Sequence, residues 1–246
     1  MKNLIEIVNL TAIKRIWRIP REIFNLTFGS NEIGSERWLI EKEKFFAPSV
    51  VKIPAVFSKF EKVRAHELLN YGGDKMSAKR HGYAKTYSKI LESLPVKGAL
   101  LEVGVLTGIS LGIWSQAKPQ WIIFGLDLNL NRYHENLIFL KSLGCFKDMK
   151  PIVLEFDCYD PDTDELVKQM LAQSITRFDL IIDDGPHTDE AILATFKELF
   201  PLISDLGCYV VEDNLTVKRE LAALAIKFGG LMKRKGDLLV VTRINQ

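Results

Sequence analysis

Short apolar runs alternate with longer amphipathic segments from about residue 99 to the end of the chain. The runs are apolar on both faces and mostly close on an acidic residue or a glycine, which is typical of buried parallel strands. They cover residues 99–104, 121–127, 151–157, 178–184, 207–213 and 237–243. The segments between them have helical character and cover residues 109–117, 133–143, 163–173, 188–202 and 217–228. This alternation predicts a doubly wound α/β fold.

The last part of the chain is arranged differently. Residues 231–235 and 238–243 flank Gly236-Asp237, a dipeptide suited to a tight turn. We therefore expect a closing hairpin and one antiparallel strand. The complete prediction is a mostly parallel, Rossmann-like sheet of seven strands with a C-terminal antiparallel hairpin.

Residues 1–70 lack this alternation and are predicted to form a helical or irregular extension to an α/β domain at 71–246. Residues 1–21 combine apolar positions such as Leu4 and Trp17 with five basic residues, which favours an amphipathic helix that ends near Pro20. Such a helix can pack on its own or a sister subunit, or lie on a membrane surface. We expect a homo-oligomer, with the extension serving in oligomerisation or as a lid.

The overall charge is nearly balanced, with 33 Lys and Arg against 31 Asp and Glu in 246 residues. A protein that coats nucleic acid would need a strongly basic surface, so a nucleic-acid partner is not expected. Apolar residues make up 47% of the chain, as in ordinary globular proteins. No stretch approaches the ~18 apolar residues of a spanning helix.

The cysteines and the N-terminus indicate a cytoplasmic protein. Cys145, Cys158 and Cys208 show neither CxxC nor zinc-site spacing, and free thiols in a reducing compartment are expected. Charged residues such as Glu6 and Lys14 interrupt any signal peptide.

Ligands of open α/β sheets bind beyond the carboxyl ends of the strands, so the residues that end each run are candidate site residues. The first run gives Glu102 and Gly104, followed by Gly108, in an E-x-G-x-x-x-G pattern that is neither GxGxxG nor a Walker loop. Asp127 follows Gly104 by 23 residues and could accept hydrogen bonds from both ribose hydroxyls. Asp157 could reach an adenine ring. Together they favour an adenosine-bearing cofactor, either NAD or S-adenosylmethionine (SAM).

Four carboxylates close the next two strands, at Asp183, Asp184, Glu212 and Asp213. Converging carboxylates repel one another unless they are protonated or bind a cation. Hard oxygen ligands at this density suit Mg²⁺. His187 lies three residues beyond Asp184, close enough to serve the same cavity.

With these residues the chain resembles the class I SAM-dependent methyltransferases. Within that class it is similar to the magnesium-dependent macrolide sugar O-methyltransferases of the mycinamicin type, with the cephalosporin hydroxylase-like proteins close in pattern. The resemblance covers roughly residues 70–214. It rests on Gly73-Asp74-Lys75, His81-Gly82-Tyr83, Tyr87, residues 101–104, Gly108, Ser110, residues 125–127, residues 183–187 and Glu212-Asp213.

The resemblance implies a role for each of these positions. It implies catalytic roles for His187, as general base, and for Asp184, and Mg²⁺ ligation by Asp184, Glu212 and Asp213. Around SAM it implies Glu102, Gly104, Gly108, Ser110, Asp127, Asp157 and Tyr83. The Asp74-Lys75 pair and residues 81–87 would close over the cofactor as a lid. Pro186 departs from the family, where Ser is more usual, and the N-terminal part is shorter than the family's auxiliary domain.

The implied activity is methyl transfer from SAM to a sugar hydroxyl of a glycosylated natural product or a polysaccharide, with a vicinal diol to chelate the metal. Three alternatives stay open: a hydroxylase-related metalloenzyme on the same scaffold, an NAD-dependent oxidoreductase, and a non-catalytic SAM-binding protein. The missing GxGxxG argues against NAD, and the acid cluster with His187 argues against a mere binder. Several aromatic residues could line an acceptor pocket, although core positions are favoured for each: Trp38, Phe45, Phe46, Tyr71, Tyr133 and Tyr159.

Overall fold

The computed structural model describes residues 32–47, 75–77 and 81–244. The predicted amphipathic helix at 1–21 lies outside these residues, as do Tyr71 and the Gly73-Asp74 pair. The homo-oligomer and the domain boundary at residue 70 stay predictions.

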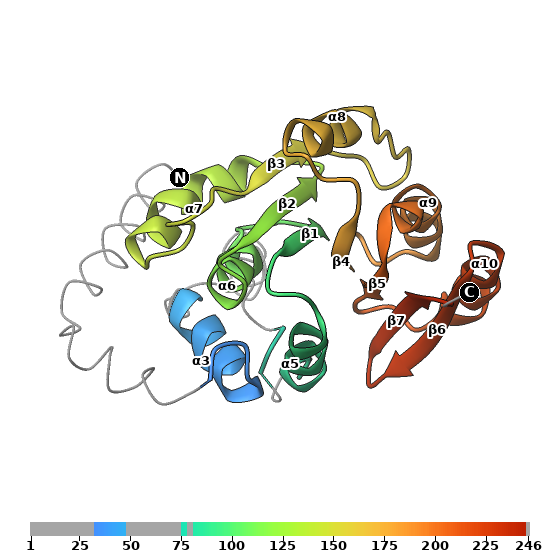
Figure 1. The fold of residues 1–246 in the computed structure, drawn as a ribbon, viewed down its shortest axis with the longest axis horizontal. Coiled ribbons are helices and arrows are strands. Elements are labelled where there is room, and N and C mark those ends of the chain that lie inside the picture. Colours follow the sequence, from blue (N-terminus) through green and yellow to red (C-terminus); the bar gives the residue numbers. More distant parts are fainter. Residues whose placement is uncertain (1–31, 48–74, 78–80, 245–246) are drawn as a thin grey trace, which may run out of the picture.

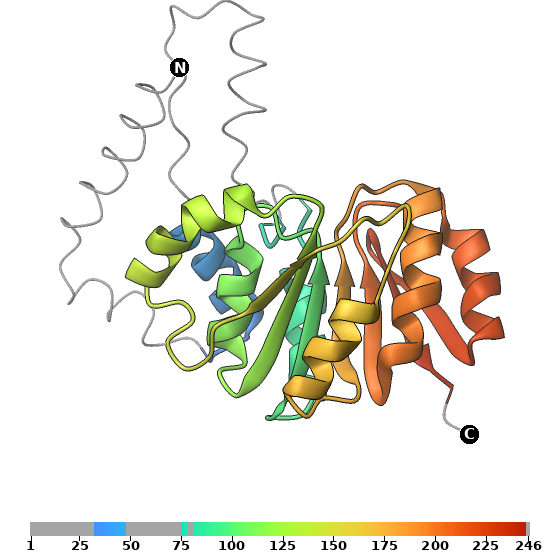
Figure 2. The same ribbon diagram turned by 90° about the horizontal axis from the view of Figure 1, so that it is seen from above.

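A single seven-stranded sheet organises the described residues, as Figures 1 and 2 show. The strands are β1 (Gly98–Val103), β2 (Trp121–Asp127), β3 (Ile152–Glu155), β4 (Phe178–Asp183), β5 (Ile203–Val211), β6 (Gly230–Lys235) and β7 (Leu238–Arg243). Their order is β3-β2-β1-β4-β5-β7-β6, and β7 runs antiparallel to both β5 and β6 while β1 to β5 are parallel. The predicted fold class is confirmed. The strand order reverses between β1 and β4, so a ligand site is expected beyond their carboxyl ends.

Helices cover both faces of the sheet (Figure 1). One face carries α3 (Glu36–Phe46), α5 (Ala84–Ser93), α6 (Ile109–Ala117) and α7 (Asn131–Ser142). The other carries α8 (Asp164–Ala172), α9 (Asp189–Leu199) and α10 (Lys218–Lys227). Each face has its own apolar core, with Trp114 and Trp121 in the first and Phe178, Phe196 and Tyr209 in the second. Among the described helices, none has the length and apolar character needed to cross a membrane.

The predicted boundaries of most elements agree to within two residues, and two differ for physical reasons. The helix predicted at 188–202 ends at Leu199, because Pro201 lies in a short 3₁₀ turn, Phe200–Leu202, that leads into β5. Strand β5 begins at Ile203 rather than at 207. Its pairing with β4 passes from Phe178↔Ile203 to Leu180↔Cys208, which is a bulge.

The carboxylate of Asp179 holds this bulge in place. It accepts hydrogen bonds from the Ala99 N–H and from the Ser204 hydroxyl, both at 3.0 Å. Gly207 packs so closely that a Cβ there would lie 2.9 Å from the Asp179 carbonyl oxygen. The bulge therefore sits at the amino end of β4, and the carboxyl end of the strand pair keeps a regular register.

Two helices, α3 and α5, were not among the predicted elements. The side chain of Ser35 accepts a hydrogen bond from the Trp38 N–H at 3.3 Å and caps the start of α3. The buried side chains of Trp38, Leu39 and Phe46 then join the core beside α5 and α6. Helix α3 therefore packs as part of the α/β core, although it lies in the segment 1–70.

Candidate active site

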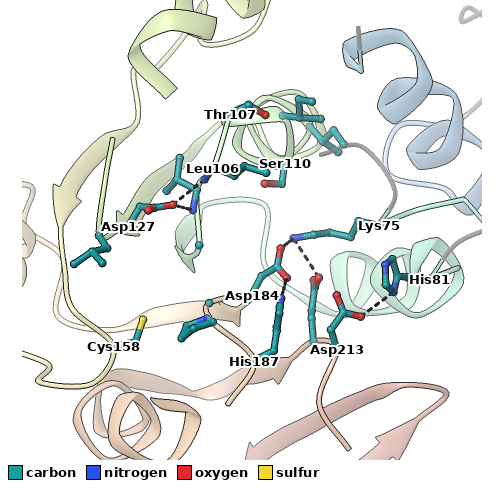
Figure 3. Close-up of a pocket in the computed structure, with 18 of the residues that line it drawn as sticks. Lys75, His81, Leu106, Thr107, Ser110, Asp127, Cys158, Asp184, His187 and Asp213 are labelled. Carbon is teal, nitrogen blue, oxygen red and sulfur yellow. Dashed lines mark hydrogen bonds and ion pairs between the residues drawn. The ribbon is translucent and has the colours of Figure 1, made fainter. Parts of the chain in front are cut away.

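A cavity of about 460 Å³ opens at the carboxyl ends of the parallel strands (Figure 3). Its walls come from the turn after β1 and from the residues that follow β2, β3, β4 and β5. Eight of the predicted site residues line it: Gly104, Ser110, Asp127, Asp157, Asp184, His187, Glu212 and Asp213. Three do not: Glu102 and Tyr83 are buried beside it, and Gly108 is the N-cap residue of α6.

The turn after β1 depends on the missing side chain of Gly104. This glycine has φ +88°, and a Cβ on it would lie 2.0 Å from the carbonyl oxygen of Asp184. The close approach is fixed by two hydrogen bonds, from the Gly104 N–H to Leu126 O at 2.8 Å and from the Asp184 N–H to Val103 O at 2.9 Å. The loops after β1 and β4 are thereby held in direct contact at the point where the strand order reverses.

The carboxylate of Asp127 organises the same turn. Its Oδ2 accepts from the Val105 and Leu106 N–H groups, both at 2.8 Å, and its Oδ1 accepts from the Asn129 N–H at 3.0 Å. Since a carboxylate offers about four acceptor positions, one position is left for a ligand hydroxyl. A ribose that engaged Asp127 with both hydroxyls would have to compete with one of these backbone donors.

Lys75 lies at the centre of three carboxylates that come from three different strand ends. Its Nζ is 2.7 Å from Glu102 Oε1, 3.0 Å from Asp184 Oδ2 and 3.3 Å from Glu212 Oε2. Burial alone would lower the pKa of Lys75, but the three carboxylates outweigh burial and hold that pKa well above its usual value. Burial in turn raises the pKa of Glu102 and of Glu212, and Lys75 opposes both rises. The lysine is therefore a charged ammonium with three acidic side chains around it.

The carboxylates of the cluster have further donors that fix their orientation. Glu102 accepts a hydrogen bond from the Trp114 indole N–H at 3.3 Å, and Glu212 accepts one from the Tyr87 hydroxyl. Burial, with the nearby carboxylate of Glu212, raises the pKa of Tyr87 well above its usual value, so the phenol stays a donor.

Asp213 faces the cavity beside a second imidazole. Its Oδ1 accepts from the Tyr83 hydroxyl and lies 2.8 Å from His81 Nδ1. The backbone of Asp213 has φ +55°, which is uncommon for a residue with a side chain and is often found at functional sites. Residues 81–87 thus contact the acid cluster itself, through both tyrosines and His81.

His187 reaches the cavity from the turn after β4. Its Nε2 is 3.8 Å from Asp184 Oδ1, which is too long for a hydrogen bond. Its backbone, at φ +56°, is held by Asn214, whose side-chain amide donates to the His187 carbonyl at 2.8 Å. The imidazole therefore stands beside the acid cluster on a backbone that is tied to the segment after β5.

Asp183 differs from its neighbour Asp184, because it points away from the cavity into the core. It accepts a hydrogen bond from the Tyr209 hydroxyl at 2.7 Å, and burial raises its pKa to about 7. Among the described residues, the group whose ligand atoms could share one metal ion comprises Asp184, His187 and Asp213, with atoms within 4.8 Å of one another. This set replaces Glu212 of the predicted set by His187.

Neither a family model nor a curated protein matches this sequence. Solved structures match it in fold. The MycE methyltransferase of the mycinamycin biosynthetic pathway, in complex with Mg and SAH, aligns with a TM-score of 0.51 and 19% identity over 69% of this chain and 51% of that chain. Its complex with Mg, SAH and mycinamycin VI gives 0.51 and 18%, over 77% of this chain and 64% of that chain. The chain has the fold of the SAM-dependent methyltransferases.

The methyltransferase fold is also found over nearly the whole length of a smaller protein. A putative caffeoyl-CoA O-methyltransferase from Staphylococcus aureus aligns with a TM-score of 0.52 and 13% identity, over 84% of this chain and 97% of that chain. The chain spans only between half and two thirds of MycE, whereas it covers this second protein almost completely.

Two residues that line the cavity, Lys75 and Glu43, were not predicted in this place. Lys75 was placed in a lid, but its ammonium joins the carboxylates at the strand ends. Glu43 on α3 is buried and accepts hydrogen bonds from the N–H groups of Met76 and Ser77, at 2.9 and 3.2 Å, so it fixes the segment that carries Lys75. No local pattern marks Glu43, because its partners lie more than 30 residues away.

The aromatic residues divide between the core and the cavity. Trp38, Phe46 and Tyr133 are buried in the apolar core, as favoured from the sequence, and Phe45 packs against it. Tyr159 instead lines the cavity, half exposed, and its hydroxyl accepts a hydrogen bond from Thr188 at 3.1 Å.

Proposed function

We propose that this chain is a magnesium-dependent O-methyltransferase that transfers the methyl group of SAM to a sugar hydroxyl of a small glycoside or of a polysaccharide. The observation that carries the proposal is one cavity that holds both the glycine turn with Asp127 and the group of Asp184, His187 and Asp213. The first part suits an adenosine, and the second suits a divalent cation with an acceptor hydroxyl beside it.

The residues present fit both ligands. The carboxylates of Asp184 and Asp213, whose ligand atoms lie within 4.8 Å of each other and of a His187 nitrogen, offer the oxygen ligands that suit a divalent cation of the Mg²⁺ type. The glycine turn brings Gly104, Val105 and Leu106 to the cavity beside Asp127, whose carboxylate accepts hydrogen bonds from the Val105 and Leu106 N–H groups. Bound SAM would supply an electrophilic methyl group, and a bound Mg²⁺ would favour deprotonation of an acceptor hydroxyl.

The chain's own side chains would position and deprotonate the acceptor. The acceptor oxygen would form a bond to the methyl carbon as the methyl–sulfur bond breaks, which would leave S-adenosylhomocysteine (SAH). The hydroxyl proton goes to His187 Nε2, since an imidazole is the side chain suited to accept a proton near neutral pH. A vicinal diol is proposed because two adjacent oxygens would chelate the metal and hold the attacking oxygen in line.

The proposal also covers the cellular location and the binding partner. The three cysteines are unpaired, which favours a reducing compartment such as the cytoplasm. The partner is a small-molecule or glycoside acceptor, and neither nucleic acid nor a membrane is part of the proposal.

The test combines binding and turnover on the full chain. Calorimetric titration with SAH, with and without Mg²⁺, measures cofactor binding, and labelled SAM with a panel of glycosides and polysaccharides measures methyl transfer. His187→Ala is expected to abolish turnover while SAH still binds, and Asp213→Ala is expected to lose metal dependence and activity together. The matched controls His134→Ala and Asp205→Ala change exposed residues outside the cavity and should keep wild-type turnover. Normal methylation by both site variants would overturn the site, and absence of SAH binding would overturn the function.

A further inference from the structure

The ammonium of Lys75 is placed where a divalent cation would also be stable. Its Nζ lies within 3.3 Å of carboxylate oxygens from Glu102, Asp184 and Glu212, and its side chain is only 11% exposed. Figure 3 shows Lys75 reaching toward Asp184, with Asp213 and His187 around the same point. One ammonium faces three carboxyl groups, whose oxygens are the ligands that a divalent cation of the Mg²⁺ type prefers.

Glu212 is not among the described residues whose ligand atoms could share one metal ion. Glu212 has both oxygens engaged, Oε1 by the Tyr87 hydroxyl and Oε2 by Lys75. With Lys75 in place, the group that could share an ion is Asp184, His187 and Asp213. That arrangement would use an imidazole nitrogen of His187 as a ligand, and a metal-bound nitrogen could not accept a proton from the acceptor.

We propose that Lys75 is a tethered cation that a divalent metal ion displaces from Asp184 and Glu212. The displacement exchanges His187 for Glu212 in the ligand set and leaves the imidazole as a base. This inference rests on the proposed function, because it concerns the metal that the methyl transfer would use.

The surroundings of Lys75 allow such a movement without loss of its charge partner. Its shortest contact, 2.7 Å to Glu102, is with a carboxylate that lies outside the possible metal group. The backbone just after Lys75 stays anchored, because the buried carboxylate of Glu43 accepts from the Met76 and Ser77 N–H groups. The side chain can therefore withdraw to Glu102 while the main chain keeps its place.

The test is Mn²⁺ binding to the full chain, measured by electron paramagnetic resonance without SAM or acceptor. Lys75→Met removes the competing charge and is expected to bind Mn²⁺ at least about tenfold more tightly than the wild type, because a like charge within a few ångströms opposes a cation strongly. Lys75→Arg keeps the charge and should stay close to the wild type. Equal or weaker binding by Lys75→Met would overturn the inference, and so would the absence of Mn²⁺ binding in every variant.

The proposed exchange of His187 for Glu212 as a metal ligand can be tested separately, by the Mn²⁺ affinity of variants at these two residues. Glu212→Gln should weaken Mn²⁺ binding at least about tenfold, whereas His187→Ala should leave it within about twofold. The opposite order would place His187 in the ligand set and overturn the exchange. If Lys75→Met does not fold, as judged by circular dichroism, the pair Glu102→Gln and Lys75→Met/Glu102→Gln provides the same comparison with one buried acid fewer.

The experiments distinguish a failure of the displacement of Lys75 from a failure of the proposed methyltransferase function. Calorimetric binding of SAH together with unchanged Mn²⁺ affinity in Lys75→Met would overturn the displacement and leave the methyltransferase. Tighter Mn²⁺ binding in Lys75→Met without any SAH binding would overturn the function and leave the displacement.

Discussion

Replacing Gly104 by Ala tests the contact between the two strand ends that form the cavity. The new Cβ would lie 2.0 Å from the Asp184 carbonyl oxygen, whereas real Cβ contacts essentially never fall below 3.0 Å. The loops after β1 and β4 would have to part by about 1 Å. Overpacking of this kind typically costs about 1–3 kcal/mol. The positive φ of Gly104 adds a further cost of about 1–3 kcal/mol for a residue with a side chain.

Gly229→Ala separates these two costs. Gly229 has φ +72°, and nothing lies within 4 Å of a Cβ built on it. This control therefore carries the backbone cost without the clash. Gly104→Ala is expected to lose about 1–3 kcal/mol more stability than Gly229→Ala. For a domain of this size the difference corresponds to a melting temperature roughly 2–12 °C lower.

Two measurements check the expectation. Differential scanning calorimetry gives the melting temperatures, and isothermal titration with SAH gives the affinity. Gly104→Ala should weaken SAH binding at least about tenfold, because Val105 and Leu106 move away from Asp127, and Gly229→Ala should bind normally. Equal melting temperatures for the two variants, together with normal SAH affinity in Gly104→Ala, would show that the close contact does not shape the site.

Three further predictions concern the cavity and its support. Asp127→Ala leaves three backbone N–H groups without their acceptor and should weaken SAH binding by about 10- to 100-fold in calorimetry, since each hydrogen bond to a charged group contributes about 1.5–3 kcal/mol; unchanged affinity would refute this role. Burial raises the pKa of Cys158 to about 11, so its alkylation by iodoacetamide, followed by mass spectrometry, should be slow at pH 8 and rise about tenfold per pH unit toward pH 11. SAH should protect this thiol, which lines the cavity, and alkylation at an undiminished rate would place the ligand elsewhere. Glu43→Ala should lower the free energy of unfolding in urea by about 2–4 kcal/mol, because two backbone N–H groups lose their acceptor, whereas Arg37→Ala, at a 75% exposed side chain of a surface ion pair, should change it by less than about 0.5 kcal/mol; similar losses would argue against this role of Glu43.

The central strands were predictable because their uninterrupted apolar sequences match the burial of both of their faces. Strand β2 spans the predicted residues 121–127, and β1 is displaced by a single residue, since both are buried on two faces and read as continuous apolar runs. Strand β5 was harder, because its first residues pair across a bulge and include the exposed Asp205 and Leu206. The apolar run at 207–213 therefore could not indicate that the strand begins four residues earlier, at Ile203.

Helix α3 shows why a buried helix can be missed. Two of its five buried positions are charged, Lys42 and Glu43, so the apolar stripe that marks an amphipathic helix is interrupted. The structure accounts for both buried charges. Glu43 accepts hydrogen bonds from the Met76 and Ser77 N–H groups. The Lys42 ammonium lies over the rings of Trp38 and Phe46, at 5.3 and 5.7 Å from their centroids. It also donates to the Gln116 side chain at 2.7 Å.

The expectation that ligands bind beyond the carboxyl ends of parallel strands located the carboxylates of the site, but it did not locate the lysine among them. Asp184, Glu212 and Asp213 lie at the edge of the cavity because parallel strands bring their carboxyl ends together. Lys75 reaches the same point from a segment that precedes the whole sheet, 27 residues before its nearest partner Glu102. Spacing in the sequence does not encode such a contact, and the same holds for His81 beside Asp213.

The bulge at the start of β5 gives the protein a natural attachment point. Leu206 is 78% exposed there, and the bulge lies at the end of the sheet opposite the cavity. The register between Leu180↔Cys208 and Asp183↔Val211 is regular, so a change of side chain at Leu206 does not alter the pairing that leads to Glu212. A dye or an immobilisation handle placed at Leu206 would report on the chain, or hold it on a surface, while the mouth of the cavity stays open to ligands.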